Sequence, residues 1–122
     1  IHAFVSHDWV KDNDPLLSGA DVLISECLEH IDQPNAEDTL KALLESSARK
    51  IVVTVPNKDF NVHFGFENDD IRHHDHKWEP TFAEWCGIAA KLVPDGWIAT
   101  TQGIGDSVDG AFVSTMTVFT RK

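Results

Sequence analysis

Ile51-Val-Val-Thr-Val55 is a run of β-branched residues that ends at Pro56. β-branched side chains favour strands, and a run without polar alternation is typical of a strand covered on both faces. Asp21-Val-Leu-Ile-Ser25 is a second short run, bounded by Gly19 and by the charged residues that follow it. The two runs predict buried strands that belong to one sheet.

Two helices are predicted to follow these strands. The first begins at Pro34-Asn35 with Asn35 as its N-cap, and its apolar residues recur at helical spacing (Leu40, Leu43 and Leu44). The second begins at the capping box Thr81-Phe-Ala-Glu84, and its apolar face consists of Phe82, Trp85, Ala89 and Leu92. Strands and helices therefore alternate along the chain.

The remaining segments complete an α/β pattern. A short strand is expected over residues 2–6, a polar turn-rich stretch over 7–19 and an irregular loop over 57–79. Two late strands, near 97–102 and 112–120, are expected to form a hairpin through a Gly- and Asp-rich loop. This order predicts a mostly parallel sheet with an antiparallel C-terminal strand, whose ligands collect where the parallel strands end.

Length and composition narrow the classes of protein. The 122 residues, 42% apolar and 25% charged, leave room for one domain, and the net charge of −10 argues against a general grip on nucleic acid. No apolar run reaches the ~20 residues of a membrane span, and no secretion signal or cysteine framework is visible. We therefore expect a cytoplasmic or nuclear protein without membrane contact. The only methionine is Met116, so we expect a piece of a longer protein.

Glu26, Glu29 and His30 follow directly after the strand at 21–25, in the spelling Glu-x-x-Glu-His. If the chain turns helical there, these positions share one face, so that two carboxylates and an imidazole converge. Such a set suits a divalent cation. A helix start that favours acidic residues, with His30 incidental, explains the same spacing equally well.

Arg72-His-His-Asp-His76 is the second cluster of ionisable residues. The His-x-His-x-Asp-His pattern of metallo-hydrolases would need a histidine at position 71, which is Ile71. Both clusters follow strands of the predicted sheet, on the edge where they can meet. A site of two Glu and two His suits Mn²⁺, Mg²⁺ or Co²⁺ better than a closed thiolate zinc site, for which the chain lacks a third and a fourth cysteine.

Three ordered motifs resemble the small-RNA 2′-O-methyltransferases of the Hua-enhancer type. They are Glu26-Cys-Leu-Glu29-His30, then Thr54-Val-Pro56-Asn57-Lys-Asp59-Phe60-Asn61, then Asp75-His76-Lys77-Trp78-Glu79-Pro-Thr81. The closing Thr115-Met-Thr-Val-Phe-Thr-Arg121 is also similar to that family's final strand. The resemblance runs nearly end to end and implies a class I, Rossmann-like methyltransferase fold.

The resemblance also implies a site and a reaction. Glu26, Glu29, His30 and His76 would be catalytic residues that bind a divalent metal, commonly Mn²⁺, on the 2′- and 3′-hydroxyls of a small RNA's terminal ribose. A bound cation lowers the pKa of a coordinated hydroxyl, and the 2′-oxygen would take the methyl group of S-adenosylmethionine. His73 and His74 do not fall on the ligand position and are interpreted as loop residues.

The Gly-rich cofactor loop and the first two strands of that fold have no counterpart in the chain. The resemblance therefore implies that residues 1–122 form the C-terminal, metal-binding part of the domain. Ala3 and Ser25 are the remaining candidates for contact with the cofactor. The other half would lie upstream or on a partner chain, as in a split enzyme. A non-catalytic metal-binding or interaction module is the alternative interpretation, and it shares the predicted metal site.

Overall fold

A computed structural model of the chain describes residues 7–66 and 71–122. The helices are α1 (His7–Asp12), α2 (Asp14–Leu17), η1 (Leu28–His30), α3 (Gln33–Glu45), η2 (Lys58–Phe64) and α4 (Phe82–Leu92), where η marks a 3₁₀ helix. The strands are β1 (Asp21–Ser25), β2 (Lys50–Pro56), β3 (Trp97–Val108) and β4 (Ala111–Arg121). The expected strand over 2–6, and with it Ala3, lies outside the described residues.

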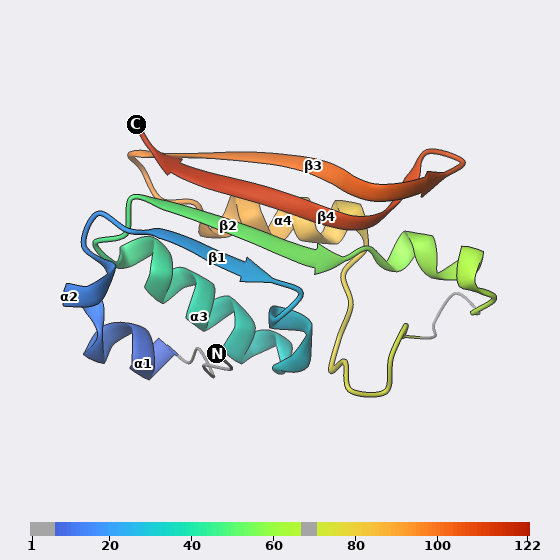
Figure 1. The fold of residues 1–122 in the computed structure, drawn as a ribbon, viewed down its shortest axis with the longest axis horizontal. Coiled ribbons are helices and arrows are strands. Elements are labelled where there is room, and N and C mark those ends of the chain that lie inside the picture. The colour runs from blue at the N-terminus through green and yellow to red at the C-terminus, as the bar shows by residue number, and fades with distance from the viewer. Residues whose placement is uncertain (1–6, 67–70) are drawn as a thin grey trace.

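The strands form one sheet in the order β1-β2-β4-β3 (Figure 1). β1 and β2 pair in parallel, whereas β4 is antiparallel to both of its neighbours, β2 and β3. β1, β2 and β3 therefore run in the same direction, and β4 runs opposite to them. This confirms the predicted α/β fold with an antiparallel C-terminal strand.

One face of the sheet carries the core. Side chains alternate between faces along each strand, and Ile51, Val53 and Phe119 on the first face are 0% exposed. They belong to one apolar cluster with leucines of α3 and with Trp85 of α4, whose indole Nε1 donates to Thr117 Oγ1 at 2.8 Å. The helices α3 and α4 thus cover this face.

The opposite face is much more open to solvent. Leu23 of β1 and Ile98 of β3 point to it, and they are 69% and 50% exposed. Val52 of β2 and Val118 of β4, which continue the row of Leu23 across the sheet, are only half-buried. In a fold that normally buries apolar strand residues on both faces, exposed leucine and isoleucine mark a surface suited to further packing.

Several element boundaries differ from the sequence predictions. Residues 7–17 form two short helices, and 58–64 a 3₁₀ helix, where irregular chain was expected. α3 starts at Gln33 with Asp32 as N-cap, and Asn35 Nδ2 donates to Asp32 Oδ1 instead of capping. The late strands extend to a tight turn at Asp109–Gly110, since pairing continues across a register shift between Ile104 and Ser107.

The second helix confirms its predicted cap but not its whole predicted face. Thr81 and Glu84 form the capping box, and Trp85 and Ala89 are buried. Phe82 is 37% exposed, because it occupies the first turn, beyond the sheet that covers the later turns. Among the helices described, none is long and apolar enough to cross a membrane.

Candidate metal centre

The centre begins at the carboxyl end of β1. Glu26 directly follows the strand, and its backbone has φ of 49°, a left-handed conformation rare for residues other than glycine. Its N–H donates to the carbonyl oxygen of Thr54 at 3.0 Å and to Thr54 Oγ1 at 3.1 Å. These bonds to β2 hold the turn that redirects the chain into η1. The condition that the chain turns helical over Glu26–His30 is met only in part, since Leu28–His30 forms a 3₁₀ turn and Glu26 lies outside it.

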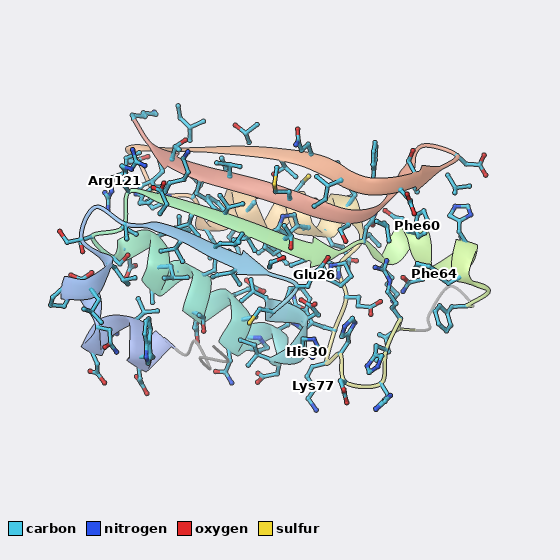
Figure 2. The ribbon with its side chains drawn as sticks, viewed as in Figure 1. Glu26, His30, Phe60, Phe64, Lys77 and Arg121 are labelled. Carbon is cyan, nitrogen blue, oxygen red and sulfur yellow. The ribbon has the colours of Figure 1, made fainter. Side chains whose placement is uncertain are left out.

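The segment 71–81 lies beside η1 and is bonded to it through the main chain. Lys77 N–H donates to the carbonyl oxygen of Glu29 at 2.7 Å, and Trp78 Nε1 donates to that of Leu28 at 3.0 Å. Figure 2 shows Lys77 next to His30 at this junction, with Glu26 nearer to the strands. The two clusters singled out in the sequence thus meet in space.

Glu29, His30 and His76 form a compact group of ligand atoms. Glu29 Oε2 lies 3.9 Å from Nε2 of His30 and 3.9 Å from Nε2 of His76. The two imidazole rings meet edge to face, with centroids 4.8 Å apart. One ligand atom from each residue lies within 4.8 Å of the others. Three of the four predicted ligands therefore come together.

Glu29 is a buried carboxylic acid with an unusual environment. The residue is 1% exposed, and its Oε1 is buried without a hydrogen-bond partner in the described part of the chain. Burial, which disfavours the charged form, raises the pKa of Glu29 to about 7. The nearby charges of Glu26 and Glu79 raise it further, while a backbone hydrogen bond and Arg72 oppose the rise. A cation beside Glu29 would relieve this penalty.

A second buried acid, Glu79, holds His76 from the other side. Its Oε2 accepts the backbone N–H of Arg72 at 2.8 Å and shares a hydrogen bond with His76 Nδ1. Its Oε1 accepts from Asn61 Nδ2 at 2.6 Å. Arg72 Nε in turn donates to Asn61 Oδ1 at 3.0 Å. His76 is thereby held with Nδ1 toward Glu79 and Nε2 toward Glu29.

Glu26 and Ser25 lie close to this group but have other partners. Glu26 Oε1 accepts from Ser114 Oγ at 2.6 Å, and Glu26 is not among the three clustered ligands. Its charge nevertheless raises the pKa of Glu29, so the two carboxylates sense one another. Ser25 Oγ is 3.1 Å from Thr54 Oγ1 and exposed at the end of β1, on the strand edge where this fold binds ligands.

His73, His74 and Asp75 form a second group of possible ligands, and all three are exposed. His74 Nε2 lies 3.2 Å from Asp75 Oδ1, and the two histidine rings stack with centroids 4.5 Å apart. His73 Nδ1 accepts the backbone N–H of Asp75 at 3.2 Å, which occupies the lone pair of that nitrogen. This group is a solvated loop tip, in line with the sequence interpretation of His73 and His74.

The first group fits a divalent cation by its own chemistry. It offers one carboxylate oxygen and two imidazole nitrogens, a donor set typical of Mn²⁺ and related ions. The orphaned Glu29 Oε1 is a buried acceptor that needs a cation, a proton or water. Glu26 would have to leave Ser114 to add a second carboxylate. Glu29, His30 and His76 are thus the residues that could hold the ion.

The supporting residues Glu79, Asn61 and Arg72 were not singled out in the sequence as functional. Glu79 and Asn61 nevertheless stand inside the quoted motifs, three residues after His76 and seven residues after Thr54. A buried acid close to a ligand histidine is the usual partner of its second ring nitrogen. That pairing is the signal that could have identified Glu79.

Comparison with known proteins gives one sequence relative and several structural ones, while no family model matches. The chain is 32% identical over 113 residues to a small RNA 2′-O-methyltransferase of Caenorhabditis elegans. This match covers 84% of the chain and 25% of that protein. The chain therefore spans about a quarter of the curated relative.

Solved structures that are similar to the chain are also methyltransferases. The crystal structure of the small RNA methyltransferase HEN1 has a TM-score of 0.76 at 26% identity, over 89% of this chain and 14% of that one. The methyltransferase domain of bacterial CtHen1 has a TM-score of 0.64 at 28% identity, over 87% of this chain and 54% of that one. A SAM-dependent methyltransferase from Archaeoglobus fulgidus, 15% identical with a TM-score of 0.59, shares the fold.

Proposed function

We propose that this chain, which belongs to the small-RNA methyltransferase family, is the metal-binding part of an enzyme that methylates RNA ends. The reaction would transfer the methyl group of S-adenosylmethionine to the 2′-hydroxyl of the 3′-terminal nucleotide of a small RNA. Glu29, His30 and His76 would hold the divalent ion, with Glu26 as a further ligand after it releases Ser114. Mn²⁺ is the expected ion, with Mg²⁺ or Co²⁺ as alternatives.

The buried, unpartnered Oε1 of Glu29 is the single observation that carries the metal part of the proposal. A buried carboxylate oxygen without a partner costs stability, and proteins retain such groups where a ligand completes them. His30 and His76 present nitrogen atoms to the same carboxylate. The arrangement is therefore better explained by cation binding than by a contribution to folding stability.

The residues of the chain would act by positioning. The bound ion would supply the positive charge that makes a ribose hydroxyl more acidic. Glu29, at 1% exposure, would fix that charge at the sheet edge, and the bonds from Lys77 and Trp78 to η1 would keep His76 opposite it. His30 is more open, with 47% of its side chain exposed, so substrate would approach from its side.

The substrate experiment compares RNA ends. Methyl transfer from labelled S-adenosylmethionine is measured, in the complete enzyme with Mn²⁺, on RNAs that end in a free ribose, a 2′-deoxyribose or a 3′-phosphate. We expect transfer to the free ribose alone, since two free hydroxyls are needed to chelate the ion. Efficient methylation of the 3′-phosphate end would overturn the proposed use of both hydroxyls.

The same proposal includes a partner for the open side of the sheet. Residues 1–122 would be the C-terminal part of a methyltransferase domain, and the cofactor-binding half would pack on β1 and on the face that exposes Leu23 and Ile98. Two observations support this: those apolar residues are exposed, and the chain matches only 54% of a bacterial methyltransferase domain. That half would be upstream in the same protein or on a second chain.

A Leu23→Asp change tests this packing. In the complete enzyme we expect it to weaken S-adenosylmethionine binding, since it places a charge in the proposed interface, and Gln33→Asp at the exposed start of α3 is the charge-matched control. Equal cofactor binding in both variants would contradict the interface. A wild-type enzyme that binds Mn²⁺ but no cofactor would instead support the alternative, a non-catalytic metal-binding module.

A further inference from the structure

We infer that Glu79 is the positioning residue of the metal centre, which fixes the protonation of the His76 ring and so sets metal affinity. This inference rests on the proposed function, since it concerns the same site. In this inference Glu79 does not bind the metal itself and acts through His76. Its side chain is fully enclosed, at 0% exposure, and it faces His76 from the side away from Glu29.

The hydrogen bonds around Glu79 make it a fixed acceptor for the His76 ring. Its carboxylate accepts two N–H groups, from Asn61 Nδ2 and from the Arg72 backbone, and it shares a third hydrogen bond with His76 Nδ1. The Asn61 and Arg72 N–H groups can only donate, and Asn61 Oδ1 is turned the other way, toward Arg72 Nε. Glu79 is therefore held in place independently of His76, and it supplies a fixed acceptor for that ring.

The tautomer of His76 follows from this arrangement. An ionised carboxylate only accepts hydrogen bonds, so His76 Nδ1 must carry the proton that it donates to Glu79. In the neutral ring the lone pair then lies on Nε2. This nitrogen is 3.9 Å from Glu29 Oε2, so two electron-pair donors face each other and suit a cation between them.

A carboxylate on the far nitrogen also makes the near nitrogen a better ligand. Such a partner orients the imidazole and increases its basicity, and its loss typically weakens metal binding by about 10- to 100-fold. The guanidinium of Arg72 strengthens the frame, since it bonds Asn61, the Asn57 carbonyl at 3.0 Å and the Val113 carbonyl at 2.9 Å. The acceptor is thus tied to β4 as well as to η2.

Asp75 is the natural control for Glu79. It is the acid next to His76 in the chain, but it points to solvent, with 62% of its side chain exposed, and it contacts His73 and His74. Asp75→Asn and Glu79→Gln remove the same charge at similar distance in sequence. Only Glu79→Gln changes the group that faces His76 Nδ1, because an amide has one acceptor oxygen where the carboxylate has two.

The first measurement needs no metal and no activity. In the full chain, freed of divalent ions and labelled with ¹⁵N-histidine, two-dimensional NMR reports which ring nitrogen of His76 carries the proton. We expect Nδ1–H in the wild type and in Asp75→Asn, and a mixture of tautomers in Glu79→Gln. A wild-type His76 protonated at Nε2 alone would overturn the inference, even if Glu79→Gln failed to fold.

The second measurement is the affinity for Mn²⁺, followed by the electron paramagnetic resonance signal of the free ion. We expect about 10- to 100-fold weaker binding in Glu79→Gln and less than about twofold change in Asp75→Asn. Equal affinity of the two variants would refute the positioning role. If the wild type binds no divalent ion, the proposed metal-dependent function fails, whereas the tautomer measurement still decides how His76 is held.

Discussion

Two groups of possible metal ligands draw on segment 71–81, one of them together with η1, and they differ in burial and in the partners that hold them. Glu29, His30 and His76 are built around a carboxylate that is 1% exposed, and His76 is braced by the buried Glu79. His73, His74 and Asp75 are all exposed, and apart from a tilted ring contact between His73 and His76 their side chains interact with one another and with the loop backbone. The types of the ligand residues alone therefore do not define a candidate metal centre. Burial of the carboxylate, and residues such as Glu79 that hold the ligands in place, distinguish the first group from the second.

The largest expected contrast is in activity. His76→Ala in the complete enzyme should reduce methyl transfer at least about a hundredfold, because it removes a braced ligand, whereas His74→Ala should retain most of the rate. Initial rates at saturating Mn²⁺ and RNA check this. Comparable losses in both variants would erase the distinction between the two groups.

The second-largest expected effect is the pH dependence of folding stability that Glu29 causes. Because burial raises the pKa of Glu29 from 4.5 to about 7, the folded chain keeps a proton that the unfolded chain has lost between these values. The folding stability that this proton contributes is complete below pH 4.5 and disappears as the pH rises through 7. The change amounts to at most about 3 kcal/mol.

Glu29→Gln should remove this pH dependence, and Asp75→Asn should leave it intact. Urea unfolding in the presence of a chelator, at a series of pH values between 4.5 and 8, measures the effect. Added Mn²⁺ should flatten the wild-type curve, since a cation favours the ionised acid. A wild type whose stability rises over this window would contradict the account of Glu29.

Asn61→Ala tests the hydrogen bonds that hold Glu79 against His76. It removes a 2.6 Å bond to Glu79 and a 3.0 Å bond from Arg72, both in the interior, and it leaves buried charges with fewer partners. We expect a loss of about 1 to 3 kcal/mol in the free energy of unfolding. Thr81→Ala, which removes the capping box of α4, gives a reference of about 1 kcal/mol for an exposed hydrogen bond.

The smallest expected effect belongs to the exposed group. The double change His74→Ala with Asp75→Asn should alter the free energy of unfolding by less than about 0.5 kcal/mol, since neither side chain supports buried structure. Denaturant titration of the double variant decides this. A loss similar to that of Asn61→Ala would show that the loop tip is part of the brace.

Local patterns in the sequence were sufficient for much of the fold. The strands at Asp21–Ser25 and Lys50–Pro56 and the capping box at Thr81 were predictable because β-branched runs and caps act over a few residues. The family prediction is confirmed by the 32% identical relative. The left-handed turn at Glu26 was not predictable, because bonds from a distant strand, through Thr54, hold it.

The residues that meet at the candidate site could be predicted from the sequence, but their supports could not. Glu29, His30 and His76 stand in short motifs, so residue type and order singled them out, together with Glu26, which lies outside the group; their role as ligands stays a prediction. Glu79 and Asn61 are joined across 18 positions of the chain by tertiary packing, which no local pattern encodes. Burial of Glu29, from which its raised pKa follows, likewise depends on how η1 packs under segment 71–81.

The hydrogen bonds that fasten segment 71–81 to η1 run from the main-chain amide of Lys77 and the indole of Trp78 to the main-chain carbonyls of Glu29 and Leu28, so they use no side chain of the candidate ligands. The frame is therefore chemically independent of the groups it carries. Exchanging Glu29, His30 or His76 for other donors would leave the spacing of the two segments unchanged. This separation makes the junction a ready host for redesign, in which a different ion is selected by substituting side chains on an unaltered backbone.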